Sequence, residues 1–467
     1  MPHEKSGPSF TPALVTFLTV IATISIGLAV FHVELHLLML IALIIVITSA
    51  LTVAKRSPKD IAFAIGAGLW EARTALVIFI LIGALIAALI QAGTVATLIH
   101  WGITLIHPGW FLPAALILSC LMSIATGTAW GTAGTAGVVL IGIGAAMDIP
   151  LPLVAGTVVS GAAFGDKMSP VSDTTNLAAM AADTDLYHHI RSMTYTTGPT
   201  LLIVSLAYTI TGRTIGANPM PQQQLDNLSN AIFSQYHVGW VTTLPFLVLI
   251  GFGLARIKAI WSMLASTLTA IAVGWLYQDT ALGQILRALW AGGSGTTGVE
   301  TVDNLFSRGG VLSMWFTLLL SVQALALGAM LSRFGYMHTI IAGLLRRVRR
   351  VGSLVATTIS AALVGNLGMG EAYMSIVLGG QLFRDEYDRR GIDRAVLSRC
   401  LEEGATLTTP LIPWTTAGVF FAGTLTVPTQ DYLPYAWLNL LNPLVGIVFA
   451  YLGWGLLNSK AAQPKGH

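Results

Sequence analysis

Residues 160–177, Ser-Gly-Ala-Ala-Phe-Gly-Asp-Lys-Met-Ser-Pro-Val-Ser-Asp-Thr-Thr-Asn-Leu, decide how the rest of the sequence is interpreted. Apolar segments flank this stretch, yet it carries two carboxylates, Asp166 and Asp173, and the ammonium of Lys167. Ionisable groups inside a lipid bilayer are costly and by default mark the path of an ion or substrate. Pro170 removes a backbone donor and disfavours helix at the preceding residue. We therefore predict a membrane helix that is broken at Pro170.

The break exposes oxygen atoms of the kind that bind a cation. Backbone groups freed at a break need other partners, and a bound ion is one of them. Asp166 and Asp173 are seven residues apart, which places them on one face of an unbroken helix and lets them converge across a break. Na⁺ prefers hard oxygen ligands, so we predict an ion site with the two aspartates as carboxylate ligands to Na⁺. Its candidate residues here are Asp166, Ser169, Ser172, Asp173, Thr174, Thr175 and Asn176.

Composition places the whole chain in a membrane. Of its 467 residues, 54% are hydrophobic and 10% are charged, and the mean hydropathy is +0.75. Soluble domains carry about 25% charged residues, so we predict an all-α polytopic membrane protein. Cys120 and Cys400 both have apolar neighbours, which argues against a disulfide framework. The first apolar span lacks a cleavage site, and we interpret it as a retained helix rather than a signal peptide.

Apolar runs of about 17–25 residues predict the membrane spans. Four runs are interrupted, at Gly127, Gly131 and Gly134, at Pro170, around Gly365–Gly370, and at Pro410 and Pro413. The runs are Pro12–Phe31, His36–Ala54, Thr74–Gly93, Trp110–Met147, Pro152–Ala182, Tyr195–Gly212, Val238–Ala255, Ile257–Gln278, Val311–Ser332, Ser353–Phe383, Ala395–Leu425 and Pro434–Leu456.

An internal repeat divides the chain into a first half, 1–213, an extracytoplasmic linker, 214–237, and a second half, 238–467. Ser169-Pro170 pairs with Thr409-Pro410, 240 residues later, and the same offset pairs Thr126 with Asn366. Repeats with broken segments in matching positions are the best sequence-level indication of a transporter site. At this offset Thr406 and Pro413 replace the two aspartates, so we predict acids in the first half and mainly neutral ligands in the second. The further candidate residues are Thr126, Thr128, Asn366, Glu371, Thr408, Thr409 and Thr415.

The distribution of Lys and Arg predicts the orientation. If all twelve runs cross the membrane, the run Arg346–Arg350 falls outside, against the positive-inside rule. If Trp110–Met147 and Ser353–Phe383 are instead re-entrant hairpins, that run and most other basic residues become cytoplasmic. This arrangement has ten crossings, five in each half, and both termini inside. An odd number of crossings per half makes the two repeats inverted, as alternating access requires.

Three segments resemble the NhaC family of Na⁺/H⁺ antiporters. They are Gly-Asp-Lys-Met-Ser-Pro-Val-Ser-Asp-Thr-Thr-Asn-Leu-Ala at 165–178, Ala-Thr-Gly-Thr-Ala-Trp-Gly-Thr at 125–132 and Gly-Ala-Thr-Leu-Thr-Thr-Pro-Leu-Ile-Pro-Trp at 404–414. The first is the specific one. The resemblance implies a Na⁺/H⁺ exchanger or a member that exchanges organic anions such as malate and lactate. The larger ion transporter superfamily is similar in its plan of repeats with hairpins.

These observations predict a secondary active antiporter of the inner cell membrane that expels Na⁺, with Li⁺ as a second candidate cation, and brings H⁺ in. Na⁺ and protons would compete for Asp166 and Asp173. The alternative is an organic-anion exchanger of the same fold. Apart from Na⁺, H⁺ and the lipid bilayer, we expect no cofactor and no nucleic acid, and a homodimer is the candidate assembly. An enzyme lacks support because no metal or nucleophile motif is found, and a channel needs a continuous pore.

Each candidate also has a purely structural interpretation. Asp173 would be only the N-cap of a helix at 174–182, and Asp166–Lys167 only a structural ion pair. Thr126–Thr132 would serve close helix packing, and Glu371 would anchor a nearby arginine. We expect Glu402 and Glu403 to be solvated at a cytoplasmic helix end. We also expect His188-His189 in a cytoplasmic loop, as ordinary polar residues more than as a pH sensor.

Overall fold

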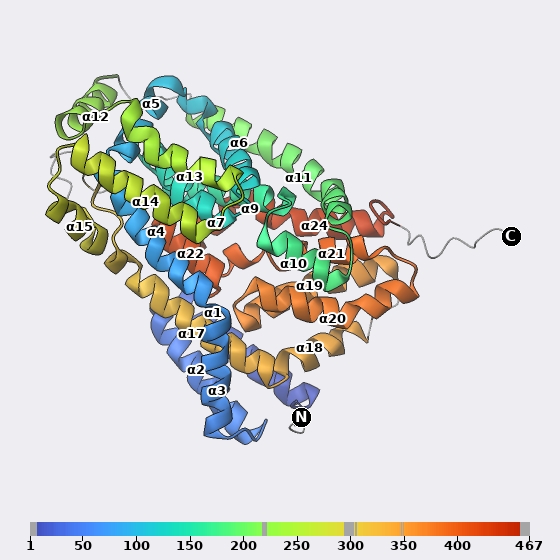
Figure 1. Ribbon diagram of the computed structural model, residues 1–467. Coiled ribbons are helices and arrows are strands. Elements are labelled where there is room, and N and C mark those ends of the chain that lie inside the picture. The colour runs from blue at the N-terminus through green and yellow to red at the C-terminus, as the bar shows by residue number, and fades with distance from the viewer. Residues whose placement is uncertain are drawn as a thin grey trace.

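The computed structural model describes residues 7–216, 222–293, 303, 306–346, 348 and 350–457 (Figure 1). Within these residues every regular element is a helix. Several predictions fall outside the described residues. They concern Arg347 and Arg349 of the basic run, part of the linker at 217–221, and both chain ends.

The first half is a series of helices separated by short turns. Its elements are α1 (Phe10–Ala29), α2 (Leu35–Thr52), α3 (Pro58–Glu71), α4 (Arg73–Gln91), α5 (Thr94–Leu105), α6 (Pro108–Thr126), α7 (Ala129–Thr132), the π-helical turn η1 (Ala133–Gly137), α8 (Val138–Ala146), α9 (Leu151–Met168), α10 (Asp173–Ala182) and α11 (Leu186–Ile215).

The second half follows the same plan after α12 (Gln222–Gln235), a helix within the stretch predicted as a linker. Its elements are η2 (Trp240–Thr243), α13 (Leu244–Leu254), α14 (Ala259–Leu276), α15 (Leu282–Ala291), η3 (Val311–Met314), α17 (Trp315–Arg333), α18 (Tyr336–Leu345), α19 (Val351–Met369), α20 (Ala372–Arg389), α21 (Arg394–Gly404), η4 (Thr409–Leu411), α22 (Thr416–Leu425), α23 (Thr429–Tyr432), η5 (Leu433–Tyr435) and α24 (Trp437–Tyr451).

The chain is a multi-pass membrane protein. Eight helices of the described residues are long and apolar enough to cross a membrane, and ten if each of two bent pairs counts as one span. The bent pairs are Ser229–Gln235 with Trp240–Leu254, and Thr429–Tyr435 with Trp437–Tyr451. Large apolar side chains such as Leu18, Ile44 and Leu202 are exposed on these helices. Contiguous apolar surface of this kind indicates contact with lipid.

The predicted breaks are confirmed at the prolines and are more localised at the glycines. The first broken helix is interrupted at 169–172, around Pro170, and the second at 405–415, around Pro410 and Pro413. Trp110–Met147 divides into two helices at Gly127-Thr128, and Ser353–Phe383 divides at Gly370-Glu371. Gly131, Gly134 and Gly365, which were also predicted as breaks, lie inside helical turns.

The two glycine turns have the same backbone conformation and are called tip 1 (Gly127-Thr128) and tip 2 (Gly370-Glu371). Gly127 has φ 67° and ψ 22°, and Gly370 has φ 67° and ψ 5°, the left-handed region that favours glycine. Thr128 and Glu371 follow in extended conformation and start the next helix. Each tip therefore closes one helix and begins another within two residues.

Helices of matching length and cap in the two halves lie 243 residues apart rather than the predicted 240. The ten-residue helices α10 and α22 begin at Asp173 and Thr416, each after a hydroxyl N-cap, and each ends at a left-handed residue. The nineteen-residue helices α6 and α19 begin at Pro108 and Val351, also 243 residues apart. At this register Pro413 is the counterpart of Pro170. Asp166 and Asp173 correspond to Thr409 and Thr416, and the predicted pairing with Thr406 and Pro413 is wrong.

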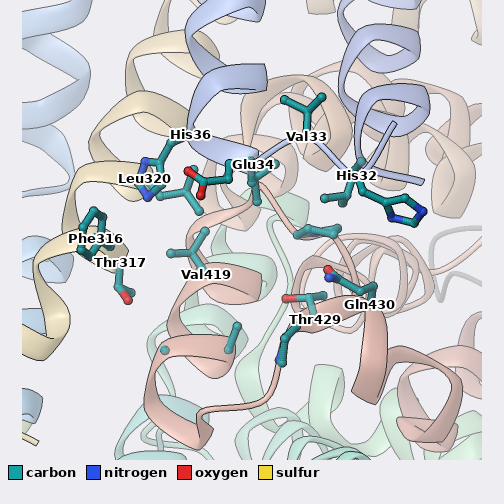
Figure 2. Close-up of a pocket in the computed structure, with 16 residues that line it drawn as sticks. His32, Val33, Glu34, His36, Phe316, Thr317, Leu320, Val419, Thr429 and Gln430 are labelled. Carbon is teal, nitrogen blue, oxygen red and sulfur yellow. The ribbon is translucent and has the colours of Figure 1, made fainter. Parts of the chain in front are cut away.

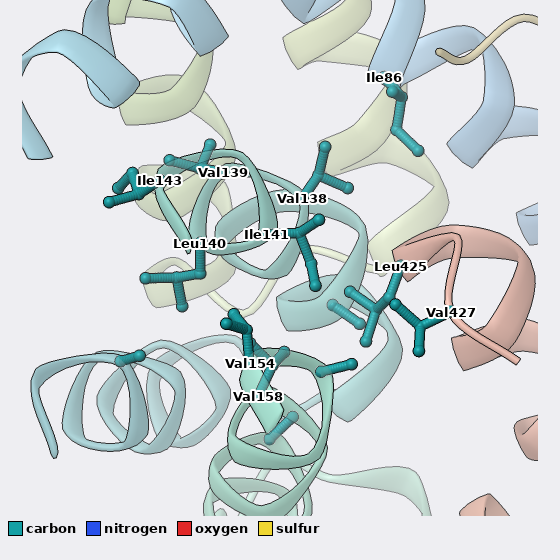
Figure 3. Packing of buried hydrophobic residues seen from close by; sticks show 14 of the residues in the cluster. Ile86, Val138, Val139, Leu140, Ile141, Ile143, Val154, Val158, Leu425 and Val427 are labelled. Carbon is teal, nitrogen blue, oxygen red and sulfur yellow. The ribbon is translucent and has the colours of Figure 1, made fainter. Parts of the chain in front are cut away.

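The two halves interlock through packed helices. α4 of the first half packs against α14 and α15, and α17 of the second half packs against α2 and α3. α10 packs against α20 and α21, whereas α22 packs against η1 and α8. Figure 3 shows part of the resulting core, in which Val138 and Ile141 of α8 and Val158 of α9 lie near Leu425 and Val427. Each broken helix is thus held by elements of the other half.

Small residues set the close approach of α6 and α9. A Cβ atom at Gly161 would lie 2.6 Å from the carbonyl oxygen of Leu116, and one at Gly165 would lie 2.4 Å from that of Cys120. Helices in lipid associate by close packing because hydrophobic burial drives them little. These glycines therefore position the end of α9, where the candidate site begins.

Candidate functional site

Asp166 lies in the last turn of α9 and is the centre of a buried hydrogen-bond network. Its Oδ1 accepts a bond from Ser172 Oγ at 2.7 Å, and its Oδ2 accepts bonds from Lys167 Nζ at 2.8 Å and Thr174 Oγ1 at 3.3 Å. Thr175 Oγ1 donates to its main-chain oxygen at 3.0 Å. The break at Pro170 allows this arrangement because it turns the start of α10 back toward the end of α9.

Lys167 connects the two broken helices. Its ammonium donates to Asp166 Oδ2 and to Thr174 Oγ1, and it lies 3.1 Å from Glu402 Oε2, on α21 of the second half. Lys167 and Glu402 are fully buried, and Asp166 is nearly so. Thr406 donates to the same Glu402 oxygen, while Glu402 Oε1 has no hydrogen-bond partner in the described chain. The triad of Asp166, Lys167 and Glu402 thus combines two carboxyl groups with one ammonium.

Asp173 has a different environment. It is the first residue of α10, its side chain is exposed, and the described residues give it no hydrogen bond or ion pair. The helix N-cap is Ser172, whose Oγ accepts a bond from Thr175 N at 3.5 Å. The interpretation of Asp173 as the N-cap is therefore wrong. It remains a carboxylate at the positive end of a helix, near the buried triad and open to solvent.

Ser169 and Asn176 stabilise the break itself. Ser169 Oγ donates to the main-chain oxygen of Ile124 in α6 at 2.8 Å. Asn176 Nδ2 donates to the carbonyl oxygens of Pro170 and Ser172 at 3.0 and 2.8 Å. These bonds tie the break to α6 and satisfy the carbonyl of Pro170, which the interruption leaves without a helical partner. Both side chains therefore shape the site, and neither is directed at Asp166.

A second cluster surrounds tip 2. Thr416, the first residue of α22, donates from its main-chain nitrogen to Gly370 O at 2.9 Å and from its hydroxyl to Glu371 Oε2 at 2.5 Å. Asn366 Nδ2 donates to Thr408 Oγ1 at 2.9 Å and to Ala405 O. Glu371 is buried, and no arginine pairs with it among the described residues. The alternative of an arginine anchor is not borne out, and Glu371 instead joins tip 2 to the second break.

The remaining candidates are Thr415, Thr408, Thr409, Thr126 and Thr128. Thr415 Oγ1 accepts a bond from Gly418 N and caps α22, and Thr408 Oγ1 donates to Gly404 O at 2.6 Å. Thr409 is buried, and its hydroxyl lacks a partner in the described chain. Thr126 and Thr128 lie apart from the triad, beside Gly253 and the α13–α14 loop. A Cβ atom at Gly127 would lie 3.0 Å from the carbonyl carbon of Val171, so tip 1 contacts the first break directly.

The two clusters lie close together in the fold. Lys167 of the first cluster is 3.1 Å from Glu402 on α21, the helix that precedes the second break. α10 packs against both α21 and α20, the helix that follows tip 2. The first break, the second break and tip 2 therefore converge on one region. Tip 1 borders this region from the far side of the first break.

Two sequence expectations are wrong because of tertiary burial. Glu402 and Glu403 are fully buried rather than solvated. Glu403 accepts a bond from Thr196 at 2.5 Å and lies 3.8 Å from Nε of the buried Arg399. His188 and His189 lie in α11 rather than in a loop, and His189 is buried against Ser398 at 2.5 Å.

Sequence reasoning did not assign Glu402 to the site, because it expected this side chain to be solvated. For Glu402 the available signal was an acidic pair, Glu402-Glu403, just before a Thr-rich and Pro-rich break. Among the described residues no group of three or more His, Cys, Asp or Glu side chains is arranged to hold a metal ion. The site instead groups carboxylates and hydroxyls around one ammonium.

Comparisons with known proteins agree on one family. Residues 8–175 and 161–454 match the Na⁺/H⁺ antiporter family. The Na⁺/H⁺ antiporter NhaC of Alkalihalophilus pseudofirmus is 36% identical, over 83% of this chain and 84% of its own. The malate-2H⁺/Na⁺-lactate antiporter of Bacillus subtilis is 34% identical over 88% of both chains.

Two further proteins are similar to this chain. The arginine/ornithine antiporter ArcD of Halobacterium salinarum is 34% identical, over 81% of this chain and 79% of its own. Among solved structures, MtrF of Neisseria gonorrhoeae, described as one of a class of antimetabolite efflux pumps, aligns with 97% of this chain and 96% of its own. That alignment has 15% identity and a TM-score of 0.41, too low to carry an argument about fold.

Proposed function

Since the chain belongs to the Na⁺/H⁺ antiporter family and is a secondary transporter of its NhaC group, we propose that it exchanges Na⁺ for H⁺ across the cell membrane. Relatives of similar identity transport different cargo, among them malate, lactate, arginine and ornithine by name. The choice of Na⁺ and H⁺ therefore depends on the chemistry of the site.

One observation carries the proposal, namely that the buried triad has one more carboxyl group than it has ammonium groups. With Lys167 charged and both Asp166 and Glu402 ionised, the triad has a net charge of −1 in surroundings that disfavour isolated charge. One Na⁺ or one proton neutralises it. Glu402 Oε1 is the carboxylate oxygen left without a partner. Competitive exchange requires a site that needs one positive charge and can take it either from Na⁺ or from a proton.

The proposed cycle uses this competition. With the site accessible from the cytoplasm, the triad binds Na⁺ through carboxylate and hydroxyl oxygens of Asp166, Ser172 and Thr174. In this cycle the ion must also bind Asp173, which is exposed at the start of α10, on its way to and from the triad, so exchange requires the Asp173 charge. On the opposite side a proton binds a carboxylate and releases Na⁺. Neutralisation by either ion lowers the cost of moving the site across the bilayer.

The orientation is also part of the proposal. We place both termini and the basic run at Arg346–Arg350 in the cytoplasm and the α1–α2 loop outside. Figure 1 supports this arrangement, because α5, α12 and α15, all assigned to the outside, gather at one end, whereas α3 and α18, assigned to the cytoplasm, lie at the other end. Residues 1–213 and 238–467 are proposed as two inverted repeats.

A carboxylate exchanger is the second candidate, because one relative at 34% identity exchanges malate and lactate by name. Its cargo would need cationic or N–H donors. Lys167 is the cation at the site, and three oxygens already surround it. The exposed Asp173 would repel an organic anion. These two features favour a cation as the cargo.

The test is Na⁺-driven proton flux in proteoliposomes, measured from pH 6 to 9 with the wild-type protein and Asp173→Asn. Competition predicts that the KM for Na⁺ rises as pH falls, while the rate at saturating Na⁺ changes little, because protons occupy the carboxylates that Na⁺ needs. Asp173→Asn keeps the size of the side chain and removes its charge, and we expect loss of exchange in both directions. A KM that ignores pH, or full exchange by Asp173→Asn, would contradict this mechanism. Flux driven by malate or lactate alone would favour the second candidate.

A further inference from the structure

A cavity of about 440 Å³ lies beside the second broken helix, between the α1–α2 loop, α17, α22 and the segment before α23 (Figure 2). Pro413 of the second break forms part of its wall. One water molecule needs roughly 10–15 Å³ of such space, so the cavity holds many waters. The space between tip 1 and the α13–α14 loop measures only about 20 Å³. The space beside the second break is thus much larger than the space at tip 1.

Glu34 supplies the only carboxylate among the sixteen residues that line this cavity. His36 lies on the same wall, where Gln323 Oε1 is 3.2 Å from its Nδ1 and Gln323 Nε2 donates to its main-chain oxygen. That pairing holds the imidazole ring at the edge of the cavity. Thr317, Thr429 and Gln430 contribute further oxygen atoms to the lining (Figure 2). The polar part of the wall is thus rich in acceptors, which suits a hydrated cation.

The α13–α14 loop of the second half has the same backbone as the α1–α2 loop. His32 and Arg256 both have left-handed φ, 50° and 59°. Glu34 has φ −57° and ψ 135°, and Lys258 has φ −54° and ψ 139°. Each of these two residues is the N-cap of an eighteen-residue helix, α2 or α14. Glu34 and Lys258 are therefore equivalent positions of the repeat.

The equivalent positions carry opposite charges. Ile257 and Ala259, the neighbours of Lys258, line the space beside tip 1, and tip 1 contacts the first break. The α1–α2 loop faces the second break, where the counterpart of Asp173 is the neutral Thr416. A cation that approaches the first break thus meets both an ammonium and a carboxylate, whereas one in the large cavity meets a carboxylate alone. The two approaches to the site differ in electrostatic potential, although their backbones match.

We propose that the 440 Å³ cavity is a vestibule for hydrated monovalent cations on the face that carries the α1–α2 loop, and that Glu34 raises the local concentration of the cation there. This inference rests on the proposed cation transport and adds a second site to it. A cleft lined by one sign of charge concentrates counter-ions, and dissolved salt screens the effect. Glu34 therefore changes the apparent affinity for the cation on the α1–α2 side. It leaves ion binding at the triad unchanged.

The first experiment measures the KM for Na⁺ from each side separately, in vesicles of both orientations. For Glu34→Gln we expect the KM on the α1–α2 side to rise roughly threefold at low ionic strength, where the Debye length is about 30 Å. The KM from the other side and the maximal rate should stay as in the wild type. With 0.3 M choline chloride the difference should shrink toward unity. Asp148→Asn is the matched control, since Asp148 is exposed in the α8–α9 turn with φ 56°, a conformation that Asn tolerates.

A second readout is independent of transport. Gln430→Cys places a thiol in the wall of the cavity, and the native Cys120 and Cys400 are buried. Glu34 should make this thiol react faster with a cationic than with an anionic methanethiosulfonate reagent, and Glu34→Gln should lower that ratio several-fold. An unchanged ratio and an unchanged KM would overturn the vestibule. An equal KM shift in Asp148→Asn would also overturn the vestibule, because it would mean that any exposed carboxylate on this face has the same effect.

The outcomes separate this inference from the proposed function. If Glu34→Gln has no effect while Asp173→Asn abolishes exchange, the vestibule is wrong and cation transport stands. If Glu34→Gln lowers the KM for an organic anion on the α1–α2 side, both the vestibule and the cation cargo are wrong.

Discussion

At the scale of single residues, the triad has two carboxyl groups and one ammonium, and in the proposed exchange this balance of charge decides what the site binds. Lys167 fills the space between Asp166 and Glu402 with three oxygen contacts, the kind of coordination that a bound Na⁺ also needs. A buried ion pair that loses one partner leaves an uncompensated charge. The net charge of the triad, more than the identity of any one side chain, should therefore set both stability and transport.

This view predicts the behaviour of three variants. Asp166→Asn and Glu402→Gln each leave one carboxylate opposite Lys167, so the triad is neutral without a bound ion, and we expect at least a tenfold loss of exchange with the fold retained. The double variant Asp166→Asn/Lys167→Met leaves Glu402 alone and restores the net charge of −1. It should recover part of the proton flux that Asp166→Asn loses. The measurement is Na⁺-driven proton flux per folded protein.

Lys167→Met alone is the informative control. It leaves two buried carboxylates without a cation, and breaking a buried pair in this way costs about 3–5 kcal/mol. Its melting temperature in detergent should therefore fall well below that of the double variant. If the double variant is as inactive as Asp166→Asn, the carboxyl group of Asp166 itself is required, and the count of charges is not what matters.

At the scale of elements, each glycine tip contacts one of the two helix breaks. Tip 1 contacts the first break through Gly127 and Val171, and tip 2 bonds to the second break through Gly370, Glu371 and Thr416. Each tip also ends one helix and begins the next within two residues. A side chain at either glycine would meet an unfavourable left-handed conformation, and at Gly127 it would also meet Val171 of the first break.

Gly127→Val tests this pairing. A non-glycine residue in the left-handed region costs about 1–3 kcal/mol, and the new Cβ would lie 3.0 Å from the main chain of Val171. We expect transport per folded protein to fall at least fivefold. Gly198→Val in α11 is the control, since a Cβ there has no atom within 4 Å. Fluorescence size-exclusion chromatography gives the folded fraction, and normal transport by Gly127→Val would mean that tip 1 does not shape the site.

At the scale of the whole molecule, helices of each half pack against helices of the other half. α4 lies against α14 and α15, α17 lies against α2 and α3, and α10 lies against α20 and α21. The site is built where these contacts meet, since Lys167 comes from the first half and Glu402 from the second. A relative movement of the halves would therefore change the site directly, as alternating access requires.

Sidedness is the prediction that belongs to this scale. Arg346 follows α18 and Gln223 lies in the first turn of α12, and both side chains are exposed. A cysteine at Arg346 should react with impermeant thiol reagents only from the cytoplasm, and one at Gln223 only from outside. The buried Cys120 and Cys400 should contribute little background. Labelling of both new cysteines from the same side would exclude the inverted arrangement.

The sequence by itself determined the membrane class, the family and the position of the proline breaks. These features are local, because an apolar run marks a membrane helix whatever it packs against, and Pro170, Pro410 and Pro413 interrupt a helix in any context. Resemblance in the stretch 165–178 was enough to identify the family. The candidate residues Asp166, Ser172, Thr174 and Thr175 also meet as predicted, because the break brings neighbours in sequence together.

Only the tertiary structure decided which distant groups complete the site. Glu402 reaches Lys167 from 235 residues away, and Asp173 is exposed while Glu402 and Glu403 are buried. Such contacts depend on the packing of α10 against α21, which residue types do not encode locally. The register of 243 likewise comes from cap geometry and helix length, whereas matching Pro170 to Pro410 gave 240. A proline interrupts a helix by itself, but the partner of a buried charge is chosen by the helices that pack around it.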